Sequence, residues 1–206
     1  MTDYFSVRMA NGVVTMIDQR RLPAETVYLD YTDPRALADA IRDMVVRGAP
    51  AIGAAAGFGL ALAAHNSPAQ TPAALWADLQ TAAEVLRLAR PTAVNLFWAV
   101  ARVLERVAEA QPADAAGMRR LVQAEADAIC AEDAAQNVQI GIHGQAVVPD
   151  PANILHHCNT GALATAGYGT ALGVIRRAHE AGKRVHVYVD ETRPRLQGAR
   201  LTTWEL

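Results

Sequence analysis

The stretch ILHHCNTGALATAGYGTALG, residues 154–173, decides the fold of this chain. Its first four residues are typical of the end of a short buried strand. An uncharged turn follows at residues 158–161, and we expect a helix rich in Ala and Gly from about residue 164 to 181. In open α/β folds such strand–turn–helix junctions lie at the carboxyl edge of the sheet, where ligands bind.

Cys158 lies in this turn. A helix start presents free N–H groups and a positive dipole end, which suits an anion such as phosphate. The same field would favour the thiolate form of Cys158. The alternative is a small apolar residue in the core, the usual role of a free cysteine. The glycines match neither a P-loop nor a GxGxxG motif, so they indicate close packing and no particular nucleotide.

The residues after the turn predict a βαβ unit. A second strand is expected at residues 184–190 and the start of a further helix at 195–206. A right-handed crossover makes the two strands parallel neighbours or near neighbours. Two parallel strands do not form a sheet buried on both faces. We therefore expect residues 145–206 to be the first part of a truncated, Rossmann-like α/β domain, and the chain to be the front part of a longer protein.

Residues 1–144 predict a separate N-terminal domain. Short strands are expected within residues 4–30, with Asn11-Gly12 as a hairpin turn. The hydrophobic period then becomes helical, and polar caps precede Pro34 and Pro72. We expect five helices, at residues 34–46, 51–64, 71–89, 93–110 and 114–137. The predicted fold class is α/β overall, with a small antiparallel sheet and a helical bundle before the parallel domain.

Composition narrows the classes of function. The 206 residues are 51% hydrophobic, enough for a sizeable core, and 19 basic against 21 acidic residues give a net charge of −2. This balance argues against nucleic acid as a partner. Cys130 and Cys158 form neither a zinc pattern nor a disulfide framework, and no signal peptide is recognisable, so we expect a cytoplasmic protein. The uncharged stretch at residues 48–64 favours a buried helix over a membrane span, because it is short and built of Ala and Gly.

Two arginines stand at predicted helix junctions. Arg47 precedes Gly48-Ala49-Pro50, and Arg90 precedes Pro91. A cation beside a helix start is unfavourable unless it meets an anion. An anionic ligand would satisfy Arg47, and so would an ion pair with a nearby carboxylate.

Several long motifs together resemble one family. They are MVVRGAPAIGAAAGFG (44–59), RPTAVNLFWAV (90–100) and the C-terminal run from HCNTGALAT to RLTTWEL (157–206), supported by IDQRRLP (17–23) and IGIHG (140–144). The sequence resembles the S-methyl-5-thioribose-1-phosphate isomerases of methionine salvage. These enzymes are related to ribose-1,5-bisphosphate isomerase and to regulatory subunits of the translation-initiation guanine-nucleotide exchange factor.

The resemblance implies an aldose–ketose isomerase that acts on a sugar phosphate, forms a homodimer, and uses no metal or other cofactor. It implies a catalytic role for Cys158. It implies substrate binding by Arg47, Gly48, Ala49, Arg90 and Gln197, and a phosphate cradle at Asn159, Thr160 and Gly161. Membrane and nucleic-acid partners are not expected.

One part of the family pattern has no counterpart in residues 1–206. The family's acid/base Asp and a substrate-holding Asn-Lys pair belong to a later segment, and Asp190 does not correspond to that Asp. We therefore expect these 206 residues alone to be inactive. Two alternatives stay open, a ribose-1,5-bisphosphate isomerase and a non-catalytic, sugar-phosphate-binding subunit.

Overall fold

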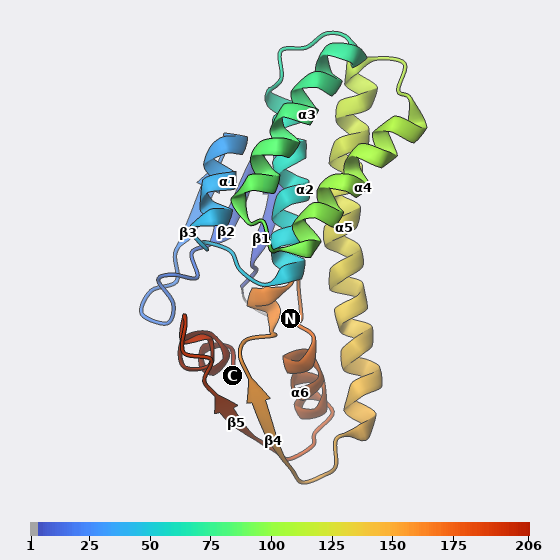
Figure 1. The fold of residues 1–206 in the computed structure, drawn as a ribbon. Helices are drawn as coiled ribbons and strands as arrows, with labels where there is room; N and C mark the ends of the chain where they lie inside the picture. Colours follow the sequence, from blue (N-terminus) through green and yellow to red (C-terminus); the bar gives the residue numbers. More distant parts are fainter. Residues whose placement is uncertain (1–3) are drawn as a thin grey trace.

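A computed structural model describes residues 4–206. The chain begins with an antiparallel sheet of order β1-β2-β3, and five helices follow it (Figure 1). Asn11 and Gly12 both adopt positive φ and form the β1–β2 hairpin turn, as predicted. The bounds are β1 Val7–Ala10, β2 Val13–Ile17, β3 Tyr28–Tyr31, α1 Pro34–Arg42, α2 Ala49–Asn66, α3 Pro72–Ala89, α4 Val94–Ala110 and α5 Ala115–Gly144.

Side-chain caps fix three of the helix starts. The oxygens of Asp33, Thr71 and Asp114 accept hydrogen bonds from N–H groups in the first turns of α1, α3 and α5. One predicted end was wrong. Helix α1 stops at Arg42 instead of residue 46, because Met44 takes a φ of +60°. Helix α5, predicted to about residue 137 and to end towards Gly141 and Gly144, continues to Gly144.

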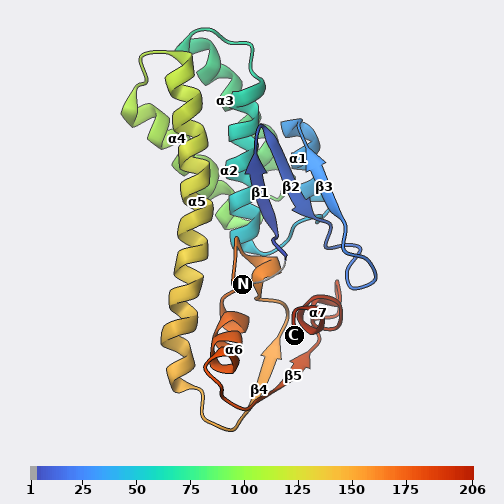
Figure 2. The same ribbon diagram turned by 180° about the vertical axis from the view of Figure 1, so that it is seen from behind.

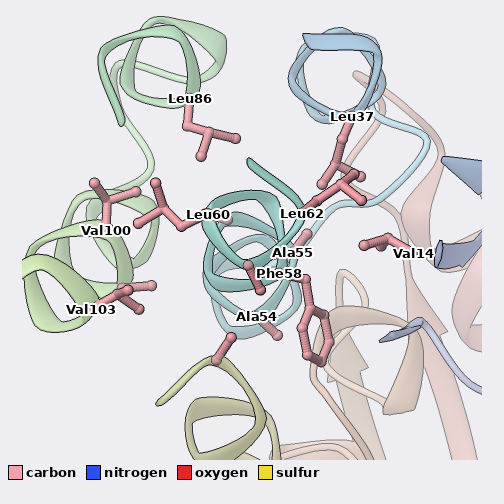
Figure 3. Packing of buried hydrophobic residues seen from close by; sticks show 14 of the residues in the cluster. Val14, Leu37, Ala54, Ala55, Phe58, Leu60, Leu62, Leu86, Val100 and Val103 are labelled. Carbon is pink, nitrogen blue, oxygen red and sulfur yellow. The ribbon is translucent and has the colours of Figure 1, made fainter. Parts of the chain in front are cut away.

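Helix α2 is the centre of the hydrophobic core. All residues from Ala51 to Ala64 are buried. Figure 3 shows Phe58, Leu60 and Leu62 of α2 among side chains of the surrounding elements. The labelled neighbours are Val14 of β2, Leu37 of α1, Leu86 of α3, and Val100 and Val103 of α4. The prediction of a buried helix is confirmed, and no helix within residues 4–206 is long and apolar enough to cross a bilayer.

The second part of the chain contains a parallel strand pair. Strands β4 Ala152–His157 and β5 Val185–Asp190 pair in register up to His157 and Asp190, and α6 Ala171–Glu180 connects them. Short helical turns lie at Gln145–Val147, Ala162–Ala164 and Gly198–Thr202, and the last leads into α7 Thr203–Glu205. Helix α5 contacts α2 and α4 as well as α6, so it runs along both parts (Figure 2). The domain boundary at residue 144 stays a prediction.

The helix predicted at residues 164–181 begins later than expected. Between Ala164 and Ala171 the chain makes turns, and Tyr168 and Gly169 adopt positive φ, which an α-helix excludes. The Thr165 hydroxyl also bonds the backbone of Gly167, two residues ahead, by donating to its carbonyl and accepting from its N–H, a local arrangement that competes with helical bonding. The Ala-rich composition favoured a helix, but these local bonds and tertiary packing decided otherwise.

Candidate active site

The candidate site lies at the carboxyl edge of the β4–β5 pair. Cys158 directly follows β4, is partly exposed, and has a φ of +67°. Its carbonyl oxygen accepts a hydrogen bond of 2.6 Å from the hydroxyl of Thr202. A non-glycine residue at positive φ is uncommon and needs support from its surroundings. The C-terminal segment therefore contacts the backbone of the residue that the sequence singled out.

The turn after Cys158 meets the start of α6 through Thr160. The Thr160 hydroxyl accepts from the backbone N–H of Leu172 at 3.0 Å, and the Thr160 carbonyl accepts from that of Thr170 at 2.8 Å. The helix start predicted immediately after the turn is thus present in space, although α6 begins ten residues after Gly161. Its first N–H groups are partly used by Thr160 itself.

Arg47 reaches the turn from the loop between α1 and α2. Its Nη1 donates to Oδ1 of Asn159 at 2.6 Å, and its Nη2 donates to the Asn159 carbonyl at 3.2 Å. Burial lowers the pKa of the Arg47 guanidinium, nearby Cys158 and Glu205 act in the opposite direction, and Arg90 lowers it further. Among residues 4–206 no carboxylate oxygen lies within ion-pair distance of Arg47, so the structure does not show the direct ion pair.

Gly48 and Ala49 connect Arg47 to the core helix. Gly48 has a φ of +94°, and a Cβ atom there would overlap with the backbone of Ala164. This close contact brings the start of α2 against the segment that follows Cys158. Helix α2 starts at Ala49 without a side-chain cap, so its first N–H groups are not satisfied by a side chain.

Arg90 is the C-cap residue of α3, and its positive charge contributes to lowering the pKa of Arg47. Its Nη1 is buried and has no hydrogen-bond partner within residues 4–206. Buried guanidinium nitrogens normally have an acceptor. Among the described residues, Arg176 Nη1 is likewise buried without a partner, so the missing acceptor is compatible with anion binding by Arg90 and does not by itself identify it.

Gln197 lies on the loop after β5, at the same edge of the sheet as Cys158. Its Oε1 accepts a hydrogen bond from the Thr192 hydroxyl, and it makes no hydrogen bond to Cys158, Arg47 or Arg90. The structure therefore joins Arg47 directly to Asn159 and packs Gly48 beside Ala164, whereas the hydrogen bond that it shows for the Gln197 side chain is to Thr192.

Sequence reasoning missed two features. One is Glu205, whose carboxylate accepts from Asn159 Nδ2 at 2.6 Å. The other is a hollow of about 30 Å³ beside Arg47, with a mainly cationic lining. Its lining residues are Gln19, Arg20, Met44, Arg47, Arg195, Arg200 and Leu201. Sequence spacing carried no signal for either feature, because the contacting residues are far apart along the chain.

Comparison with known proteins identifies the family of this chain. The sequence model described as the Initiation factor 2 subunit family matches residues 45–206, more than half of the chain. The chain belongs to the Initiation factor 2 subunit family. Within this family, a relative from Synechococcus sp. named methylthioribose-1-phosphate isomerase is 52% identical over all 206 residues. A relative of the same name from Trichlorobacter lovleyi is 54% identical over 98% of the chain.

Solved structures of the family share the fold. The 5-methylthioribose 1-phosphate isomerase from Pyrococcus horikoshii OT3 superposes with a TM-score of 0.94 at 45% identity and covers 99% of this chain. A protein titled translation initiation factor eIF-2B, subunit delta, from A. fulgidus gives 0.90 at 39% identity over 99% of this chain. The chain spans 59% and 58% of the two relatives' lengths, and 57% and 59% of the two solved chains. The resemblance seen in the sequence is confirmed.

Proposed function

We propose that this chain supplies part of the active site of an isomerase that converts S-methyl-5-thioribose 1-phosphate into S-methyl-5-thioribulose 1-phosphate. The observation that carries the proposal is the cluster at the carboxyl edge of β4 and β5. There a partly exposed cysteine is followed by Asn159, which is bonded to the half-buried guanidinium of Arg47, and Arg90, which has an unpartnered nitrogen, interacts electrostatically with Arg47. Relatives of that name at 52% and 54% identity give further support.

The reaction is redox-neutral and needs no external oxidant. The bond between C1 and the ring oxygen breaks, and the ring oxygen gains a proton. C2 becomes a carbonyl as its hydroxyl loses a proton and C2 itself loses its hydrogen, while C1 gains a hydrogen; the two hydrogens lost at C2 balance those gained by the ring oxygen and C1. Because the anomeric oxygen carries phosphate, the sugar cannot open spontaneously as a free aldose does, so the protein has to promote ring opening.

In this proposal, Arg47 and Arg90 bind the anionic sugar phosphate, since guanidinium groups form strong charge-assisted bonds to phosphate oxygens. The uncapped start of α2 at Gly48 and Ala49 adds backbone N–H groups. Cys158, as a thiol or thiolate, takes part in the hydrogen transfer between C2 and C1 or stabilises its transition state.

Further substrate contacts are proposed for Gln197 and for the turn at Asn159, Thr160 and Gly161. The side chain of Asn159 is engaged with Arg47 and Glu205. Its contribution to a phosphate cradle is therefore proposed for its backbone. Thr160 and Gly161 form the rest of that proposed cradle.

The test is conversion of methylthioribose 1-phosphate followed by NMR. Two proteins are compared, residues 1–206 alone and the same residues followed by the remaining C-terminal part of the Synechococcus relative. We expect turnover only from the longer protein, its loss in Cys158→Ser, and its retention in Cys130→Ser. A folded longer protein that binds the sugar phosphate without converting it would favour the non-catalytic subunit instead. A homodimer and a cytoplasmic location stay predictions.

A further inference from the structure

Glu205, near the C-terminal end of α7, has a fully buried side chain. Its Oε2 accepts from the Tyr4 hydroxyl at 2.6 Å, and its Oε1 accepts from Asn159 Nδ2 at 2.6 Å. Arg176 Nη2 lies 3.9 Å from Oε2. A buried carboxylate is costly unless it is paired and hydrogen-bonded. These contacts supply the compensation and hold the carboxylate in place.

The amide of Asn159 stands between Glu205 and Arg47. Because Nδ2 donates to the carboxylate of Glu205, Oδ1 is the atom that faces the guanidinium, where it accepts from Arg47 Nη1. Rotation of the amide by half a turn would set an NH₂ group against a guanidinium, two donors without an acceptor. A carboxylate accepts only, so it favours this orientation of the amide, and the Thr202 hydroxyl oxygen accepts from the same NH₂ group at the longer distance of 3.3 Å.

The surrounding backbone leaves room for this contact. A Cβ atom on Gly161 would overlap with the carboxylate of Glu205, so the space exists because residue 161 is glycine. Three residues before Glu205, Thr202 donates to the carbonyl of Cys158. The same C-terminal segment therefore contacts both Cys158 and Asn159.

We propose that Glu205 is a positioning residue: its buried carboxylate orients the Asn159 amide, and that amide holds the Arg47 guanidinium beside the Cys158 turn. The significance of this arrangement for catalysis rests on the proposed function. The arrangement itself, and the measurement that tests it, need no substrate.

The test is the rate of alkylation of Cys158 by iodoacetamide at pH 7 in the 206-residue chain carrying Cys130→Ser. The thiolate is the reacting form, and a neighbouring cation favours it. We expect Arg47→Ala to slow alkylation roughly tenfold and Glu205→Gln to slow it roughly threefold. Glu205→Asp, which keeps the charge on a shorter side chain, should also slow it. Neither Glu205 variant should change the rate further when combined with Arg47→Ala.

If the charge of Glu205 instead acted directly on the Cys158 thiol, Glu205→Gln would change the alkylation rate in the opposite direction. Removing a negative charge would then speed alkylation, with or without Arg47, and that result would overturn the proposal. An unchanged rate in both Glu205 variants would overturn it as well.

Glu191→Gln is the matched control, since Glu191 accepts from the N–H groups of Gly198 and Ala199 and does not touch Asn159. If it slowed alkylation as much as Glu205→Gln, general loosening of the C-terminal segment would be the cause and the proposal would fall. If the Glu205 variants do not fold, Gly161→Ala displaces the carboxylate without changing the charge and should slow alkylation too; an unchanged rate would contradict the proposal.

Discussion

At residue 48 the backbone turns with a φ of +94°, directly in front of α2 and after Arg47. Only glycine adopts this conformation without a steric penalty. The absence of a side chain also lets the backbone of Ala164 approach closely. Glycine at position 48 thus permits both the positive φ of the backbone and the close approach of Ala164. That approach joins the start of α2 to the segment after β4.

We expect Gly48→Ala to lower the free energy of unfolding by more than about 2 kcal/mol. A non-glycine residue in such a sparsely populated backbone region costs about 1–3 kcal/mol, and the overlap with Ala164 adds to it. Gly182→Ala is the matched control, because Gly182 has a φ of +85° but nothing within 4 Å of its added Cβ. Urea unfolding of both variants checks this. Equal losses would show that the contact with Ala164 contributes nothing.

At the scale of the element, α2 differs from the helices around it. Its neighbours bury one face, whereas all residues of α2 from Ala51 to Ala64 are buried. Helices on several sides require small residues at the contacts. A Cβ atom on Gly59 would lie 2.8 Å from the Leu86 side chain of α3, and one on Gly53 would lie 3.1 Å from the Asn95 carbonyl of α4. The Ala- and Gly-rich composition of α2 is therefore a packing requirement.

Leu60→Ala should destabilise the protein by about 2–5 kcal/mol, because it leaves a cavity at a fully buried position. Leu88→Ala, at a position on α3 that is 72% exposed, should change the free energy of unfolding by less than about 0.5 kcal/mol. The comparison is made by denaturant unfolding. A loss below about 1 kcal/mol at residue 60 would mean that the core closes around the missing atoms.

At the scale of the molecule, ion pairs and hydrogen bonds set the response to acid. Hydrogen bonds from Arg102 lower the pKa of Glu132, and a hydrogen bond from His157 lowers that of Asp190. Backbone and side-chain hydrogen bonds from Arg184 lower the pKa of Asp150. Burial acts in the opposite direction on Asp133 and raises its pKa. Carboxyl groups with a lowered pKa therefore outnumber those with a raised pKa.

We therefore expect the free energy of unfolding to fall as the pH falls from about 5 to 3. A carboxyl whose folded-state pKa is lowered binds protons more readily in the unfolded chain, so acid favours unfolding. Its stabilisation is complete above the unfolded-state pKa of about 4 and is lost as the pH falls through the folded-state value. Urea unfolding at pH 7, 5, 4 and 3 measures the effect. A constant or rising stability toward pH 3 would contradict it.

The sequence by itself determined what depends on near neighbours. Helix period and caps located five helices, because a cap and its partner are two or three residues apart. Strand alternation and the Asn11-Gly12 turn located the hairpin, and the long motifs indicated the family. The tertiary structure decided what depends on contacts between distant segments. Arg47 meets Asn159 across 112 positions and Tyr4 meets Glu205 across 201, and no local pattern encodes such pairs, because folding alone brings these residues together.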